Sequence, residues 1–203
     1  MTLPELDVPN PTPDELTRHQ QYLHDQADTM LAETGLLDLL AHYGELEPIS
    51  GSYAYGLMVY PDLDLGIVSD TADKQEFAEL VSKLVRASFV RKVSTADTVN
   101  FPPVHTGRPK GFWLGLEIPY GADKWGVDCW LQRPEWQEGD TDTYAERLRH
   151  ISPKQTVAIL AIKHYLIFNG LYGKTFYSVD VYDDVLDHEV LSVEGFKAKH
   201  LLE

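Results

Sequence analysis

Polar and apolar residues alternate along some stretches of the chain and recur at helical spacing along others. Alternation with period two predicts strands that bury one face, over residues 62–67, 112–120 and 124–131. Apolar residues three and four positions apart predict helices, over residues 12–34, 36–43, 73–87, 152–169 and 179–188. Short apolar runs predict two further strands, at residues 47–49 and 89–93. The interspersed strands and helices predict an α/β (α+β) fold.

Helix-start signals and a change in composition divide the chain. Thr12-Pro13-Asp14-Glu15 and Ser152-Pro153-Lys154-Gln155 each form a predicted capping box, with a hydroxyl cap and a proline in the first turn. Three prolines and no periodicity predict a loose N-terminal arm before the first box. We therefore expect an arm over residues 1–11, a main domain with the predicted strands over 12–140 and a C-terminal helical region over 145–203. Residues 94–110 are expected to form a long loop, and residues 132–143 a linker.

A Gly-Ser pair stands close before two aspartates. Nine residues separate Gly51-Ser52 from Asp62-Leu63-Asp64-Leu65. Because strand side chains alternate, Asp62 and Asp64 share one face, roughly 7 Å apart, while the leucines line the other face. Two carboxylates this close repel each other, and one pKa rises unless a cation lies between them. Mg²⁺ is the usual cation, because it prefers oxygen ligands.

The predicted hairpin that follows carries two further carboxylates, Asp128 and Glu117. Pairing Pro119 with Lys124 across its turn places Gly115 opposite Asp128. Glu117 then lies diagonally on the same face. Hairpin geometry leaves Asp128 and Glu117 as competing choices for a third carboxylate beside Asp62 and Asp64.

These residues resemble a known signature. Gly51-Ser52, the nine-residue gap and the Asp-x-Asp strand are similar to those of the DNA polymerase β-like nucleotidyltransferase superfamily, and the short chain resembles its small-molecule branch, the lincosamide and aminoglycoside nucleotidyltransferases. The resemblance implies a mixed sheet flanked by helices, with a C-terminal helical appendage. It also implies that backbone amides at Gly51 and Ser52 hold a nucleoside triphosphate (NTP) and that two Mg²⁺ ions bind three carboxylates, Asp62, Asp64 and Asp128.

The resemblance extends to three residues of the C-terminal region. Lys163 lies within an apolar helix, where it either extends its ammonium to water or reaches the triphosphate. Tyr177 either stacks on the base of the nucleotide or packs in the core. Ser178 is expected to cap the following helix and to touch a phosphate. The acidic residues of that helix are expected to form a solvated face.

Composition narrows the choice of partners and compartment. The 203-residue chain has a net charge of -15, which disfavours a long nucleic acid and favours a small acceptor. Two groups of basic residues are exceptions: Lys83, Arg86, Arg91 and Lys92, and then His105, Arg108 and Lys110. A single cysteine, Cys129, excludes an internal disulfide and is expected in the core. Without a secretory signal or an apolar run of about 18 residues, a cytoplasmic location away from membranes is expected.

The predicted function is Mg²⁺-dependent transfer of a nucleoside monophosphate from an NTP, ATP among them, to an acceptor, with release of pyrophosphate. The alternative is a non-catalytic nucleotide-binding or antitoxin-like interaction protein on the same scaffold. The sequence leaves the acceptor, the preferred NTP and the oligomeric state open.

Overall fold

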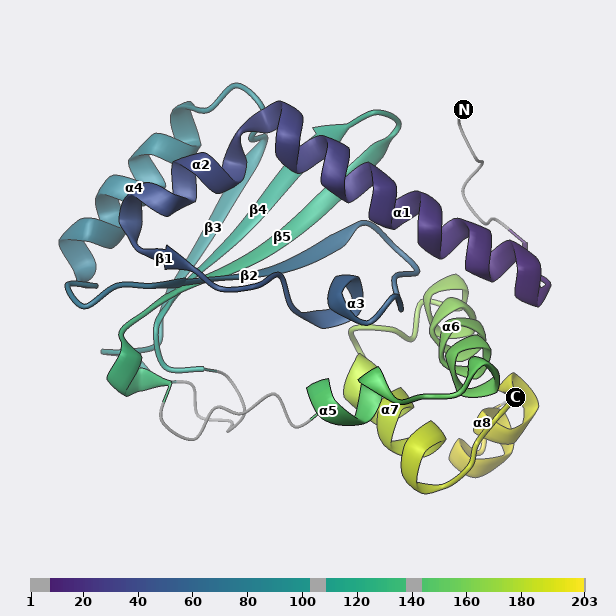
Figure 1. The fold of residues 1–203 in the computed structure, drawn as a ribbon. Helices are drawn as coiled ribbons and strands as arrows, with labels where there is room; N and C mark the ends of the chain where they lie inside the picture. The colour runs from purple at the N-terminus through teal and green to yellow at the C-terminus, as the bar shows by residue number, and fades with distance from the viewer. Residues whose placement is uncertain (1–7, 103–108, 138–143, 203) are drawn as a thin grey trace. The chain divides into compact units, whose positions relative to one another are not determined.

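The computed structural model describes residues 8–102, 109–137 and 144–202, and it divides into two compact units (Figure 1). Unit 1 comprises residues 1–25, 55–60 and 143–203, and unit 2 comprises residues 26–54 and 61–142. Helix α1 (Pro13–Thr34) contributes its first part to unit 1 and its last part to unit 2. The predicted division at residues 12–140 and 145–203 stays a prediction.

Unit 2 contains a five-stranded sheet in the order β1-β2-β5-β4-β3. Its strands are β1 (Glu45–Leu46), β2 (Asp62–Val68), β3 (Lys92–Asp97), β4 (Phe112–Tyr120) and β5 (Asp123–Gln132). β2 and β5 run parallel to each other, and the other neighbours are antiparallel. The mixed sheet confirms the predicted fold class.

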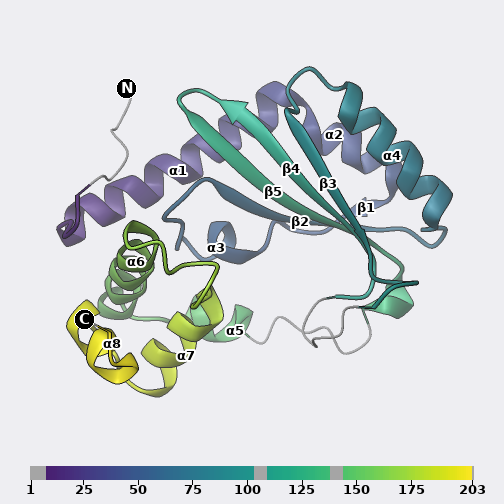
Figure 2. The same cartoon turned by 180° about the vertical axis from the view of Figure 1, so that it is seen from behind.

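One face of the sheet is apolar and is covered by helices (Figures 1 and 2). These are α2 (Leu36–Leu40), α4 (Lys74–Arg86) and the last part of α1. Alternation along β2 buries Leu63, Leu65 and Ile67 on this face and leaves the residues between them half-buried. Burying one face of each strand supplies the main driving force for the unit, at about 25 cal/mol per Å² of apolar surface.

The hairpin of β4 and β5 has the predicted register. Pro119 pairs with Lys124, and Gly115 pairs with Asp128. The register is fixed locally, because a slip of one residue would turn every buried side chain toward the polar face.

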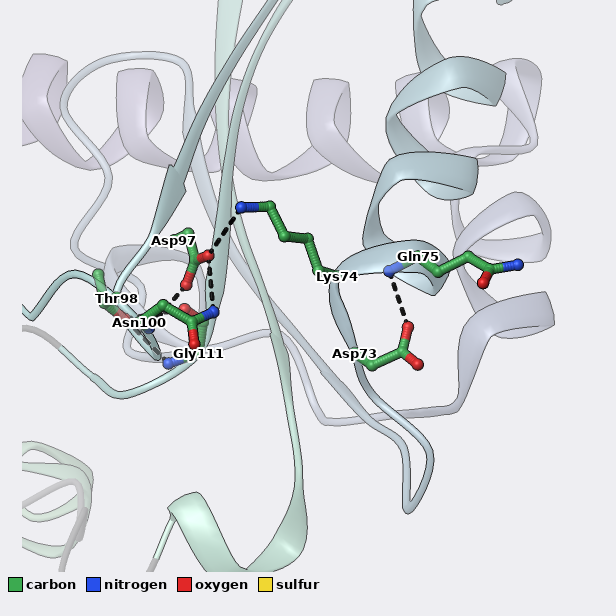
Figure 3. Close-up of polar contacts among 7 residues, drawn as sticks. All are labelled: Asp73, Lys74, Gln75, Asp97, Thr98, Asn100 and Gly111. Carbon is green, nitrogen blue, oxygen red and sulfur yellow. Dashed lines mark hydrogen bonds and ion pairs between the residues drawn. The ribbon is translucent and has the colours of Figure 1, made fainter.

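Helix α4 begins where the sequence predicts. Asp73 caps it by accepting hydrogen bonds from the amides of Gln75 and Glu76, both at 2.8 Å. Lys74 of its first turn reaches the carboxylate of Asp97 at the end of β3, at 3.6 Å, as Figure 3 shows. This ion pair ties the start of the helix to the edge of the sheet. Val85, which lies at helical spacing with the buried residues of this helix, is 63% exposed, so the buried stripe is narrower than the apolar pattern.

Two strand predictions were wrong in their limits. β3 spans Lys92–Asp97 instead of residues 89–93, so part of the expected loop is strand. Its residues are mostly polar and give no alternating signal; β4 supplies the hydrogen-bonding partner that makes them a strand. β1 covers Glu45–Leu46 instead of residues 47–49, and Ser50 instead forms an isolated bridge with Asp64. The remainder of the expected loop includes His105 and Arg108, which lie outside the described residues.

Unit 1 is helical and has its own core. Besides the first part of α1, it contains α5 (Ala145–Arg149), α6 (Pro153–Phe168), α7 (Ser178–Asp187) and α8 (Val193–His200). The capping boxes predicted at Thr12 and Ser152 are both present. Helix α8 was not predicted; Ser192 caps it, and Phe196 buries it in the core. None of the helices in the described ranges is long and apolar enough to cross a membrane.

The acidic residues of α7 form the expected solvated face only in part. Asp184 is buried and accepts hydrogen bonds from Lys199 and His200 of α8, each at 2.6 Å. Asp183 and Asp187 instead bind Arg147, at 3.9 and 2.6 Å. The sequence pattern of α7 does not predict these contacts, because the cationic partners come from other helices.

The buried Asp184 should make unit 1 sensitive to acid. Burial raises the pKa of this carboxyl, but the hydrogen bonds from Lys199 and His200 outweigh burial and hold the pKa below its ordinary value of 3.8. A lowered folded-state pKa gives stability that is complete above the unfolded pKa and is lost as the pH falls through the folded one. We expect Asp184→Asn to flatten the fall of the melting temperature below about pH 4. Thermal melts between pH 6 and 2 measure this, with Asp70→Asn, at an exposed aspartate, as the control.

Candidate functional site

The central carboxylates lie side by side on neighbouring parallel strands. Asp64 of β2 and Asp128 of β5 are register partners, so both side chains leave the half-buried face of the sheet. Neighbouring strands are about 4.8 Å apart. The sequence placed Asp62 and Asp64 on one face, and the sheet adds Asp128 from 64 positions further along the chain.

The Asp62 carboxylate occupies space that a glycine on the neighbouring strand leaves open. Its register partner is Gly126, two residues before Asp128. A Cβ atom at Gly126 would lie 2.8 Å from the Asp62 Oδ1 atom, so the carboxylate occupies the space of the missing side chain. Glycine within a strand marks such a close approach, and this signal was available from the sequence but was not used.

The Gly-Ser pair lies directly against Asp64. It begins α3 (Gly51–Ala54), a single turn, and the amide of Ser50 donates to the Asp64 carbonyl at 3.1 Å. Gly51 has a φ of +64°, which favours glycine, and a Cβ atom there would overlap with the Asp64 carboxylate. Gly51 is therefore required both by its backbone conformation and by the carboxylate beside it.

Glu117, the competing third carboxylate, already has two cationic partners. Arg91 and Lys124 lie 3.2 and 3.4 Å from its oxygens. It pairs with Gly126, so a whole strand separates it from Asp62, whereas Asp128 is the direct neighbour of Asp64. The geometry favours Asp128 over Glu117.

Three oxygen donors of this kind suit a hard divalent cation such as Mg²⁺. As placed in the described residues, no three His, Cys, Asp or Glu side chains are gathered closely enough to hold a metal ion. The donor chemistry and the spacing of the strands fit a metal ion. Binding it would require the three carboxylates to move closer together.

Cys129 lies on the opposite face from Asp128, as expected. It is fully buried, and burial, with a smaller contribution from the charge of Asp128, raises the pKa of its thiol to about 12. A thiol this hard to ionise is a core residue and a poor nucleophile.

Lys163 belongs to unit 1 and is buried completely, so the prediction that it might extend to water was wrong. Its ammonium donates to the carbonyl of Leu57 at 2.8 Å and lies about 6 Å from the ring centres of Tyr172 and Tyr182. Leu57 is part of the segment that joins α3 to β2. A role for Lys163 at the triphosphate stays a prediction.

The other two predicted nucleotide contacts lie at the start of α7, also in unit 1. Tyr177 is 54% exposed, so the expected core packing was wrong. Its amide donates to Asp180 at 2.7 Å, which makes Tyr177 the cap and Ser178 the first helical residue. The Ser178 hydroxyl instead lies 2.5 Å from the Tyr172 hydroxyl. An exposed aromatic ring at this position is available to stack on a base.

Solved structures with a similar fold are known. The non-canonical poly(A) polymerase complex GLD-2–GLD-3 aligns with 83% of this chain and 58% of its own, at 15% identity and a TM-score of 0.50. The GLD-2/RNP-8 complex aligns with 90% of this chain and 65% of its own, at 16% identity and a TM-score of 0.50. The fold is that of a nucleotidyltransferase.

The similarity to these nucleotidyltransferase structures is one of fold. A cytoplasmic RNA terminal U-transferase aligns with 77% of this chain and 48% of its own, at 14% identity, but its TM-score of 0.47 is too low to support an argument. The chain spans about half to two thirds of the length of these solved structures. No protein-family model and no curated protein matches the chain.

Proposed function

We propose that the protein is a Mg²⁺-dependent nucleotidyltransferase, which transfers a nucleoside monophosphate from an NTP to an acceptor. One observation carries this proposal: Asp64 and Asp128 are register partners on parallel strands, and Gly51 packs directly against Asp64. The similarity of the fold to that of a poly(A) polymerase complex supports it.

The proposed residues bind metal, phosphate or base. Asp62, Asp64 and Asp128 would hold two Mg²⁺ ions, which when bound neutralise the phosphates and make the acceptor hydroxyl more acidic. The backbone at Gly51 and Ser52 binds phosphate oxygens. In unit 1, Tyr177, Ser178 and Lys163 stay predicted nucleotide contacts, Tyr177 for a base and the other two for phosphates.

The reaction is an in-line displacement at the α-phosphorus. The acceptor oxygen forms a bond to this phosphorus, the bond to the bridging oxygen breaks, and pyrophosphate leaves with the bonding electrons. The Asp128 carboxylate accepts the proton of the acceptor hydroxyl and acts as general base.

Two observations bear on the acceptor and point in different directions. The net charge of -15 favours a small molecule over a long polyanion. A similar structure is that of a non-canonical poly(A) polymerase complex, and this name suggests an RNA end. On the basis of charge, a small molecule is the favoured acceptor.

Calorimetric titration with ATP, GTP, CTP and UTP tests the proposal. We expect at least one NTP to bind in the presence of Mg²⁺ and to bind much more weakly with EDTA, because the carboxylates repel the triphosphate when no cation is present. A folded protein that binds none of the four would contradict the proposal. Binding without metal-dependent release of pyrophosphate, across a range of acceptors, would instead favour the non-catalytic nucleotide-binding protein.

A further inference from the structure

Two tryptophans form the row next to the carboxylates on the same face of the sheet. Trp113 of β4 and Trp130 of β5 are register partners, and both are half-buried. Trp130 follows Asp128 by two residues, so its side chain leaves the same face. The row continues to Ala96 of β3 on one side and to Gly66 of β2 on the other, where the Glu47 carboxylate lies in the space that a Cβ atom would fill. The two indoles therefore border the carboxylates directly.

The two indole rings extend in opposite directions along this face. A Cβ atom at Gly115 would lie 2.7 Å from Cη2 and Cζ2 of Trp113, so this indole lies over Gly115, the residue opposite Asp128. A Cβ atom at Gly111 would lie 3.3 Å from Cε3 of Trp130, so the second indole reaches toward the start of β4. Together the rings form an aromatic strip that begins beside Asp128.

Cationic side chains lie at the end of β5, beyond this strip. Lys110 and Arg133 lie 5.7 and 5.2 Å from the ring centre of Trp136. The Gln132 side chain donates to the Lys110 carbonyl at 2.8 Å, and Arg133 donates to the Ala72 carbonyl at 2.8 Å. The bond to Ala72 positions the Arg133 guanidinium, which also lies 3.7 Å from the Glu135 carboxylate, and Gln132 holds the backbone at Lys110.

We propose, on the basis of the function inferred above, that Trp113 and Trp130 bind a nucleobase of the acceptor. An indole stacks on any base, because every base has a π-face. A base lying on Trp113 places its own sugar hydroxyl beside Asp128, the proposed general base, while phosphates further along the acceptor meet Lys110 and Arg133. The acceptor is thus a nucleoside compound: either a free nucleoside or nucleotide, or the end of a single strand.

Direct binding of two probes distinguishes these sources. Adenosine represents the free nucleoside, and a fluorescein-labelled single-stranded oligoadenylate of ten nucleotides represents a strand with a free 3′ hydroxyl. Calorimetry and fluorescence anisotropy, respectively, measure their affinity without any NTP. If the strand is the acceptor, its affinity falls with rising salt, because phosphate contacts release counterions. If the free nucleoside is the acceptor, adenosine binds at least as tightly as the strand.

Probe binding by variants of the two tryptophans, compared with the wild type, tests the proposal. We expect Trp113→Leu and Trp130→Leu to weaken binding of the preferred probe by about tenfold or more, and Trp113→Phe, which keeps an aromatic ring, by much less. Their affinity for NTP with Mg²⁺ should match that of the wild type. Phe101→Leu is the matched control, since Phe101 is 71% exposed and lies 5.7 Å from Lys74 in α4, which covers the other face. It should bind both probes like the wild type.

Three results would overturn the inference: neither probe binds, both leucine variants bind as tightly as the wild type, or the variants lose NTP affinity instead. If the wild type still binds NTP with Mg²⁺, the nucleotidyltransferase proposal stands and only the tryptophan site fails. If the wild type binds no NTP, the proposed function fails. Trp113→Phe gives a readable result even where a leucine variant does not fold.

Discussion

Asp64→Asn is expected to abolish nucleotidyl transfer and to leave the melting temperature unchanged or higher. Asp64 lies between Asp62 along β2 and Asp128 on the neighbouring strand, so its charge is repelled from two sides. Removing that charge relieves the repulsion and costs the fold little. An amide is a far weaker ligand for Mg²⁺ than a carboxylate. Since even partners outside the ligand set cost roughly 10–100-fold when removed, we expect a loss greater than about a hundredfold.

Pyrophosphate release and thermal melts, measured on the same preparation, test this prediction. Asp70→Asn is the control, because Asp70 is an exposed aspartate two residues after the end of β2. It should keep both activity and melting temperature. Wild-type activity in Asp64→Asn would remove Asp64 from the mechanism. A lower melting temperature would show that its carboxylate is structural.

Gly51→Ala should lose both stability and activity, whereas Gly35→Ala should lose only stability. The two glycines have nearly the same φ, +64° and +65°, so alanine is strained by roughly 1–2 kcal/mol at either position. Around Gly35 no atom lies within 4 Å of the added Cβ. At Gly51 the added methyl overlaps with the Asp64 carboxylate and must displace it. Because Asp64 is a proposed metal ligand, this displacement should lower the affinity for Mg²⁺.

The pair is compared by chemical denaturation and by the Mg²⁺ dependence of pyrophosphate release. We expect Gly51→Ala to need a higher Mg²⁺ concentration for half-maximal rate, with Gly35→Ala unchanged. Equal losses of stability and equal Mg²⁺ dependence in the two variants would show that the contact between Gly51 and Asp64 does not contribute to Mg²⁺ binding.

Much of the fold could be read from local patterns. Capping boxes at Thr12 and Ser152, the alternation of β2 and the register of the β4–β5 hairpin were all predicted, and each involves residues close together in the chain. The polar strand β3 could not be predicted, because its partner β4 determines it. Helix α8 was missed, since its apolar content is low and a single residue, Phe196, buries it.

The candidate site shows the same division. The sequence itself determined that Asp62 and Asp64 share a face, because side chains alternate along any strand. Only the tertiary structure decided that Asp128 lies beside Asp64, that Glu117 is held by Arg91 and Lys124, and that Lys163 donates to the Leu57 carbonyl. Alternation along a strand determines which face a side chain points to. Its neighbours depend on the pairing of distant segments, and burial of apolar surface over the whole chain selects that pairing.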